Sequence, residues 1–354
     1  MKKIYLDYAS LTPIDKGVMK QINKYSTAEY SNPQSFYSSA VSSKRAIDDA
    51  KERIANVLHA HSDEIFFTSG GTESNNLVLQ NKINRHIIIS SIEHSSVMNP
   101  IEATHIPVDN NGMIDLEFLK KSITTETTLV SVMLVNNEIG TIEPLAEIAK
   151  IVRDARKNFG GQFPLLHTDA CQAIVHLPIY VEKLGVDFIS LDGHKIYGPR
   201  GVGMLYARRG TIDINRPGTA NLPGIMGLAY AIEFNEKIRE KETARISELK
   251  EYFINELLKI DQRIRVNGDL DHFSPHILNV SIPDIDSEFF VLQLDARGIE
   301  CSTKSACLKD EDESYVLREI GANSKNSIRF SFGRNTTKGD LKSVLKVITQ
   351  ILQK

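Results

Sequence analysis

The chain has 354 residues, of which 41% are hydrophobic and 25% charged, and its formal net charge is −3. This composition is typical of a folded globular protein, and the length exceeds that of a usual single-core domain. The slightly acidic balance without a basic run argues against a nucleic-acid or membrane-surface binder. No apolar run approaches the roughly 20 residues that span a bilayer, and the first residues lack the apolar core of a signal peptide, so we expect a cytoplasmic location.

The cysteine content is low, with three residues: Cys171, Cys301 and Cys307. An odd, small number of cysteines argues against a disulfide framework and favours a reducing compartment.

Helical and strand patterns alternate from about residue 40 to residue 207. Apolar residues at helical spacing predict a helix over 39–58, and a β-branched run predicts a strand over 64–68 that leads into a second helix over 73–83. The later runs are short and nearly continuously apolar, as in strands buried on both faces of a sheet. The alternation predicts an α/β fold with a mostly parallel sheet flanked by helices. The further predicted elements are strands at 86–90, 104–108, 129–135, 163–168, 186–191 and 203–207, and a helix at 144–159.

The order of elements changes after a long predicted helix over 224–258. Two strands at 276–282 and 327–332 then alternate with helices at 288–296 and 337–352, which indicates a smaller α+β domain. We therefore predict a large cofactor-binding domain over 15–250. The predicted small domain covers 251–354 together with the N-terminal segment 1–14, with the long helix bridging the two parts.

Polar residues follow five of the predicted strands directly. In open α/β sheets, ligands bind at the carboxyl ends of the strands, so these residues are expected to converge on one site. The five groups are Gly70-Gly71-Thr72, Glu93-His94, Asn136-Asn137-Glu138, Asp169 with Gln172, and Gly193-His194-Lys195.

Each group suits a phosphorylated, electron-poor ring. Gly70-Gly71-Thr72 opens a helix, whose free N–H groups bind phosphate, although a plain helix cap explains this motif alone. Asp169 can pair with a protonated pyridine nitrogen, or act as a cap. His94 can stack on a ring and exchange protons, although a lone histidine is more often structural.

Lys195 lies in a mostly apolar segment between a strand and a turn. Burial of a lysine favours its neutral amine, the form that attacks a carbonyl to give a Schiff base. A solvated turn lysine is the commoner case, but the combination of five groups favours a pyridoxal 5'-phosphate site.

The chain resembles the cysteine desulfurases, pyridoxal-phosphate enzymes of the class V aminotransferase fold. The resemblance covers nearly the whole length and rests on several long motifs in the same order. These motifs are Tyr5-Leu6-Asp7-Tyr8, Asn32-Pro33, the run from Phe67 to Asn76, Glu93-His94, the run from Val135 to Gly140, Asp169-Ala170-Cys171-Gln172, the run from Gly193 to Pro199, Arg216-Pro217-Gly218-Thr219, Ser305-Ala306-Cys307 and the run from Ser327 to Ser331.

The resemblance implies a role for each residue around the ring. Lys195 would hold the cofactor as a Schiff base and Asp169 would pair with the ring nitrogen. His94 would stack on the ring and act as acid and base, while Asn137 and Gln172 would bind the ring hydroxyl or orient its neighbourhood.

The resemblance also implies how the phosphate and the substrate are bound. Arg329 would bind the substrate carboxylate with help from Asn32, a two-pronged task that suits a guanidinium group. Thr219 would reach a phosphate across the interface of a homodimer. In the same chain, the phosphate would be held by Gly71, Thr72 and His194.

Cys307 matches the sulfur-accepting nucleophile of the family. It lies in a polar stretch, 302–314, where two lysines favour the thiolate and a run of acidic residues opposes it. A polar loop would let this cysteine take sulfur inside the site and deliver it outside. Cys301 falls on a predicted strand, where packing is the expected role, and Cys171 is expected to pack beside the ring.

The resemblance implies an L-cysteine desulfurase that yields alanine and a persulfide on Cys307. A sulfur-acceptor protein, either an iron–sulfur scaffold or a thiolation enzyme for cofactors or tRNA, would then take the sulfur. Alternatives are a related pyridoxal-phosphate lyase of the selenocysteine lyase type, a sulfinate desulfinase, an aminotransferase, or a weakly active scaffold of a sulfur-transfer complex. No metal site is predicted.

Among the departures from the family pattern, two bear most on the phosphate site. Asp192 stands where a phosphate-binding serine is usual, and a carboxylate beside a phosphate dianion is unfavourable unless it turns aside or is protonated. We place Asp192 among the cofactor-binding residues, and the alternative is that it turns aside and caps a backbone N–H. The segment 210–215 is also short and lacks a glycine-rich run. Both features motivate the scaffold alternative.

Overall fold

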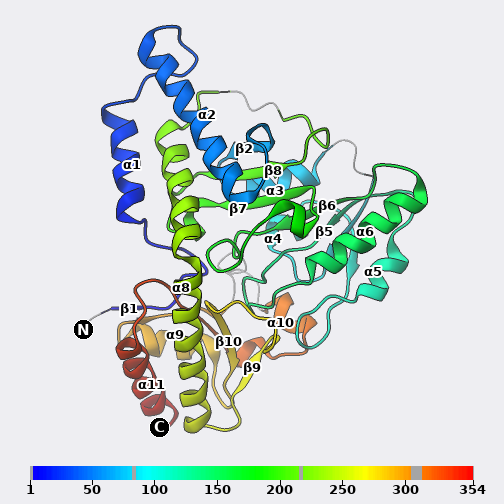
Figure 1. The fold of residues 1–354 in the computed structure, drawn as a ribbon. Coiled ribbons are helices and arrows are strands. Elements are labelled where there is room, and N and C mark those ends of the chain that lie inside the picture. Colours follow the sequence, from blue (N-terminus) through cyan, green and yellow to red (C-terminus); the bar gives the residue numbers. More distant parts are fainter. Residues whose placement is uncertain (1–2, 82–84, 215–217, 304–312, 354) are drawn as a thin grey trace.

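The computed structural model describes residues 3–81, 85–214, 218–303 and 313–353 (Figure 1). Its centre is a seven-stranded sheet of strand order β2-β8-β7-β6-β5-β3-β4. The strands are β2 (Ile65–Thr68), β3 (His86–Ser90), β4 (Thr104–Ile106), β5 (Thr127–Ser131), β6 (Leu165–Asp169), β7 (Phe188–Asp192) and β8 (Gly203–Ala207).

One strand of this sheet runs against the others. β8 is antiparallel to both of its neighbours, β2 and β7, whereas the remaining pairs are parallel. The reason is the short β7–β8 connection, residues 193–202, since a parallel crossover needs a dozen or more residues. The predicted mostly parallel sheet is thus confirmed.

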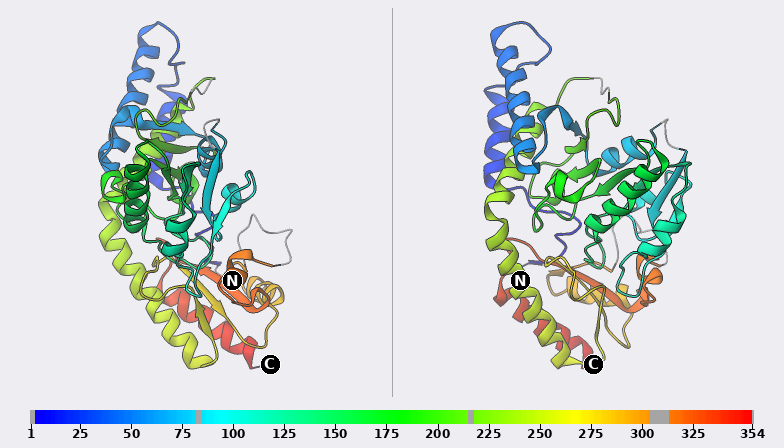
Figure 2. Two further views of the ribbon diagram at one scale, coloured as in Figure 1. Left: turned by 90° about the vertical axis from the view of Figure 1, so that its right-hand side faces the viewer. Right: turned by 45° about the vertical axis from the view of Figure 1, so that its right-hand side comes forward.

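Helices cover both faces of the seven-stranded sheet (Figure 2). Successive strand residues point to opposite faces, so Leu166 and Ile189 pack in the larger core while their neighbours Leu165 and Phe188 pack in a second cluster. The larger core includes residues of α2 (Ser38–Leu58), α6 (Leu145–Phe159), α7 (Val181–Leu184) and α8 (Leu222–Ile260), while the second includes residues of α3 (Gly71–Leu79) and α4 (Ser95–Met98). The remaining helices of this part are α1 (Lys16–Thr27), which packs on α8, and α5 (Leu116–Ser122).

A separate core lies below this sheet in Figure 1. It is built on the antiparallel strands β9 (Arg265–Asn267), β10 (Ile277–Ser281) and β12 (Ser327–Ser331). The N-terminal strand β1 (Ile4–Tyr5) pairs with β11 (Ile299–Glu300), so the start of the chain belongs to this region. Helices α9 (Ser287–Asp295), α10 (Tyr315–Glu319) and α11 (Lys338–Leu352) complete the C-terminal part.

The long helix α8 supplies side chains to two cores. Leu222 to Ile232 pack in the larger core of the seven-stranded sheet, and Ile246 to Leu257 pack in the core of the C-terminal part. The continuous helix predicted over 224–258 is therefore present. Two cores joined by one helix support the two predicted domains, whose boundaries stay a prediction. Among the described residues, no helix has both the length and the apolarity that a membrane span requires.

Candidate active site

A cavity of about 250 Å³ lies where the carboxyl ends of β2, β3, β5, β6 and β7 meet the N-terminal segment and β12. Each of the five predicted strand-end groups contributes at least one lining residue. The cavity is lined by Ala9, Ser10, Gly71, Thr72, His94, Ser96, Met133, Asn137, Asp169, Cys171, Gln172, Asp192, His194, Lys195 and Arg329.

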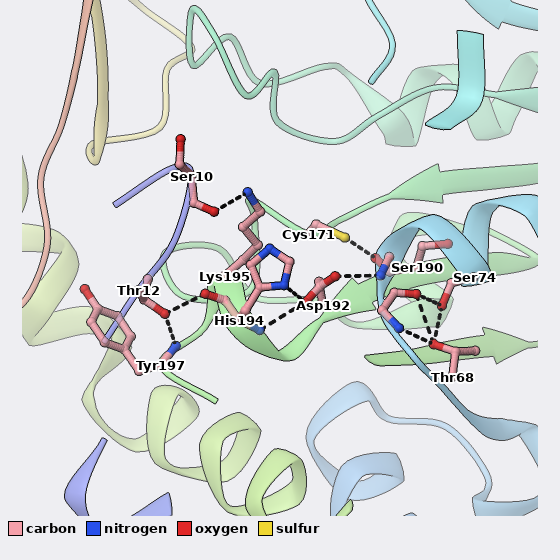
Figure 3. Close-up of polar contacts among 12 residues, drawn as sticks. Ser10, Thr12, Thr68, Ser74, Cys171, Ser190, Asp192, His194, Lys195 and Tyr197 are labelled. Carbon is pink, nitrogen blue, oxygen red and sulfur yellow. Dashed lines mark hydrogen bonds and ion pairs between the residues drawn. The ribbon is translucent and has the colours of Figure 1, made fainter. Parts of the chain in front are cut away.

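Lys195 ends the 3-10 turn that follows β7 (Figure 3). Its amine donates hydrogen bonds to the backbone carbonyls of Ala9 and Ser10, both at 2.7 Å. These two carbonyls orient the amine at the cavity wall.

Asp169, the last residue of β6, is buried and accepts two hydrogen bonds. One comes from the backbone N–H of Cys171 at 2.9 Å, and the other from the side-chain amide of Asn75 at 2.8 Å. Asn75 lies on α3 and donates to Ser96 Oγ as well, at 2.9 Å. These two donors fix the position of the Asp169 carboxylate at the cavity.

His94 caps α4, and its Nδ1 accepts a hydrogen bond from the backbone N–H of Ser96 at 3.2 Å. Because Nδ1 is an acceptor, the neutral imidazole carries its proton on Nε2.

Gln172 is fixed from two sides. Its amide N–H donates to the Ala9 carbonyl at 2.9 Å, so its oxygen faces His276 Nε2 at 3.1 Å. Burial lowers the pKa of His276 well below its ordinary value, which keeps the ring neutral, and because the Gln172 oxygen can only accept, Nε2 is the donor.

At the N-terminus of α3, Asp192 takes the donors expected for a phosphate. Its carboxylate accepts the N–H of Gly71 at 2.7 Å and the N–H of His194 at 3.0 Å, and it pairs with His194 Nδ1 at 2.5 Å (Figure 3). The expected cap is therefore present, but Asp192 does not turn aside, because it lines the cavity itself. Asp192 thus caps backbone N–H groups that lie at the cavity, and its role toward the cofactor stays a prediction.

Arg329 on β12 is almost completely buried and held by three groups. It donates to the Asn137 carbonyl at 2.8 Å, to Asp7 Oδ1 at 2.9 Å and to Ser10 Oγ at 2.8 Å. Two other buried atoms, Arg329 Nε and Asn137 Oδ1, have no hydrogen-bond partner among the described residues. Both atoms belong to residues that line the cavity, where a ligand can supply the partner.

Comparison with known proteins gives a consistent assignment. The model of the aminotransferase class V family matches residues 4–344. A curated cysteine desulfurase, IscS of Dictyoglomus turgidum, is 39% identical over 100% of this chain and 95% of its own length. The chain belongs to the cysteine desulfurase family.

Solved structures agree with this assignment. A NifS-like protein superposes with a TM-score of 0.90 at 31% identity, covering 99% of this chain and 100% of the other. SspA, solved in complex with cysteine, superposes with a TM-score of 0.78 at 28% identity over 94% of this chain and 99% of the other. Both the predicted family and the predicted fold are thus confirmed.

Nine residues of the predicted site of this cysteine desulfurase lie together at the cavity: Gly71, Thr72, His94, Asn137, Asp169, Gln172, Asp192, His194 and Lys195, and Arg329 joins them from β12. Asn32 and Thr219 do not line it. Asn32 is exposed, and its side-chain oxygen accepts the N–H of Gln34 at 3.0 Å. Thr219 is also exposed, and its role across a dimer interface stays a prediction.

The three cysteines differ in their surroundings. Cys171 lines the cavity, and burial raises the pKa of its thiol, with a further increase from Asp169 and Asp192. Cys301 packs against the core of the C-terminal part, where burial also raises the pKa of its thiol. Cys307 lies outside the described residues.

The sequence interpretation gave no role to Asn75 and Asp7, which hold Asp169 and Arg329. Both lie in motifs that carried the resemblance. Asn75 stands four residues after Gly71 on the same helix and therefore faces the same way, a spacing that could have suggested its position.

Proposed function

We propose that this chain is a pyridoxal-phosphate-dependent L-cysteine desulfurase that transfers the substrate sulfur to Cys307. The observation that carries the proposal is the convergence of Lys195, Asp169 and Arg329 on one cavity inside a cysteine desulfurase fold. The residues present fit the ring of the cofactor. Asp169 offers a carboxylate and Lys195 an amine, and the buried Asn137 Oδ1 lacks a partner among the described residues.

In this mechanism, Lys195 would hold the cofactor, Asp169 its ring nitrogen, and Asn137 and Gln172 the region of its hydroxyl group. When bound, pyridoxal phosphate supplies an electron-withdrawing ring that stabilises negative charge on the amino-acid substrate. Arg329 binds the substrate carboxylate through its remaining N–H groups, among them the Nε–H, and its pairing with Asp7 keeps the guanidinium in place. His94 Nε2 and the Lys195 amine are the groups that move protons.

Sulfur transfer needs a thiolate nucleophile, and we assign this role to Cys307 in the segment that follows β11. The Cys307 thiolate attacks the sulfur of cysteine, and a sulfur–sulfur bond forms as the carbon–sulfur bond breaks. The electron pair of that bond stays with the substrate carbon, which takes a proton and leaves as alanine. In the overall reaction, cysteine and the Cys307 thiol are converted to alanine and a persulfide on Cys307.

The described residues on both sides of Cys307 support this role. The backbone N–H of Ser302 donates to the Arg329 carbonyl at 3.2 Å, and the backbone N–H of Arg329 donates to the Ser302 carbonyl at 2.6 Å. On the other side, Ser314 donates to Glu138 at 2.7 Å, and the Tyr315 hydroxyl donates to the Glu93 carbonyl. These anchors adjoin Asn137 and His94, so the described residues before 304 and after 312 lie beside the cavity.

Replacement of Cys307 by alanine tests the assignment. We expect the visible absorbance of lysine-bound cofactor to remain, because Lys195 is intact, and the gain of one sulfur atom on the protein to disappear from mass spectra. Alanine production should fall by at least about 10²-fold, the usual cost of losing a nucleophile. Cys301→Ala is the matched control and should keep both signals. Alanine release at the wild-type rate by the Cys307→Ala variant would refute the role of this cysteine.

The partners form a second part of the proposal. We propose a homodimer, which would let Thr219 meet the phosphate of a second copy. Large exposed apolar side chains near the α1–α2 connection support it, among them Tyr30, Phe36 and Tyr37, with Phe36 98% exposed. A sulfur-acceptor protein and a cytoplasmic location complete the proposal. Sedimentation of the purified chain at micromolar concentration checks the dimer.

A further inference from the structure

The phosphate end of the cavity already contains an anion. Asp192 accepts the backbone N–H of Gly71 at 2.7 Å, the first residue of the nine-residue helix α3. The N-terminus of a helix attracts negative charge, so this is the group that a phosphate would be expected to contact. Here its first N–H is engaged by a carboxylate of the same chain.

The second donor is engaged by the same side chain. Asp192 accepts the backbone N–H of His194 at 3.0 Å and lies 2.5 Å from the imidazole Nδ1. Two of the residues expected to hold the phosphate, Gly71 and His194, therefore share one internal partner.

The carboxylate is tightly packed as well as bonded. A methyl group added at Gly70 would lie 2.7 Å from Asp192 Oδ2, so this oxygen rests directly on the glycine backbone. Only 9% of the Asp192 side chain is exposed. A phosphate oxygen could not reach the Gly71 N–H without moving Asp192.

The carboxylate is charged near neutral pH. Burial alone would raise the pKa of Asp192, but contact with His194 and the donated N–H groups outweigh burial and lower it. A phosphate dianion at the same donors would meet a like charge at close range, which is strongly unfavourable in a buried site.

We propose that Asp192 is an internal competitor of the cofactor phosphate: its carboxylate holds the Gly71 and His194 donors of the phosphate subsite, so that the phosphate group adds little to cofactor affinity. This inference rests on the proposed function. It implies that the cavity selects its cofactor mainly by the ring and the aldehyde, through Asp169, Asn137 and Lys195. The site then distinguishes pyridoxal phosphate only weakly from pyridoxal.

Equilibrium titration with pyridoxal phosphate and with pyridoxal, followed by the visible absorbance of lysine-bound ligand, tests the proposal. In the wild-type chain the two ligands should differ in affinity by about tenfold or less. Asp192→Ser and the size-conserving Asp192→Asn should each bind pyridoxal phosphate at least about tenfold more tightly, because the competing charge is gone. Their affinity for pyridoxal should stay within about threefold. Asp154→Ser, an exposed change on α6, controls for lost charge.

The outcomes separate this inference from the proposed function. Unchanged or weaker binding of pyridoxal phosphate by both Asp192 variants, with absorbance present, would overturn the competitor role and leave the enzyme assignment standing. A wild-type preference for pyridoxal phosphate of about 10³-fold or more would also overturn it, even if neither variant folds. No ligand-dependent absorbance in the wild-type chain or any variant would overturn the proposed function, and this inference with it.

Discussion

The two ends of the cavity differ in how far their polar atoms are satisfied by the protein. The open end is formed by Arg329 and Asn137. Two of its buried atoms, Arg329 Nε and Asn137 Oδ1, have no hydrogen-bond partner among the described residues. The closed end is formed by Gly71, Asp192 and His194. There the Asp192 carboxylate accepts the N–H groups of Gly71 and His194, so the protein satisfies these groups itself. A ligand therefore completes the open end but has to compete at the closed end. Mutations should follow the same division: at the open end they should reduce binding, and at the closed end they should improve it.

The largest effect is expected from Arg329→Lys. Lysine keeps the charge but lacks the planar set of N–H donors that serves Asp7, Ser10 and the Asn137 carbonyl and still leaves Nε for a substrate. We expect kcat/KM for L-cysteine to fall about 10²- to 10³-fold, with most of the loss in KM.

The exposed Arg318→Lys is the matched control for this change, since 68% of the Arg318 side chain is exposed. A loss of less than about threefold in kcat/KM for Arg329→Lys would show that the open end does not bind the substrate.

The next effect concerns Asn137→Ala, which removes an oxygen that the described protein does not use. Stability should change little, with a melting temperature within about 2 °C of wild type, whereas cofactor affinity should fall about tenfold.

The neighbouring Asn136→Ala is a sharp comparison for this variant. Asn136 donates to the Ile92 carbonyl at 2.9 Å and accepts the N–H groups of Glu138 and Ile139 at 2.9 and 3.0 Å. Its loss should lower stability by about 2 kcal/mol, measured by denaturant unfolding. If both variants lost the same stability, the Asn137 side chain would have to be as fully hydrogen-bonded within the protein as that of Asn136, and the proposed difference between them would be wrong.

The smallest effect is expected from Cys171→Ser at the closed end. The Cys171 thiol contacts the Ser190 carbonyl weakly, at 3.8 Å, and its raised pKa keeps it protonated. Alanine production and cofactor affinity should stay within about twofold of wild type. If alanine production instead stopped as completely as in Cys307→Ala, the sulfur acceptor would have to be reassigned.

The strand-end rule predicted most of the cavity because its physical basis is local. Parallel strands end at one edge, so Lys195, Asp169 and His94 could be expected to meet once their strands were recognised. The antiparallel β8 did not disturb this, since β2 and β7 still point the same way.

Partners that depend on tertiary contacts could not be predicted in this way. Asn75 reaches Asp169 across 94 residues of sequence, and although its helical spacing from Gly71 indicates the face on which it lies, no local pattern identifies Asp169 as its partner. For Asp192, sequence reasoning recognised the unusual residue and the N–H cap. It could not show that the capped N–H groups line the cavity, because that depends on how closely Gly70 and β7 approach.

The contact between Asp7 and Arg329 joins residues 322 positions apart, and the carbonyls of Ala9 and Ser10 that hold the Lys195 amine lie in the same short N-terminal segment. During synthesis, the ribosome adds these residues long before their partner on β12. At the roughly 5–20 residues per second typical of translation, the early segment waits many seconds for Arg329. The sheet edge can assemble meanwhile, but the amine-binding wall gains its guanidinium support only when the last part of the chain emerges.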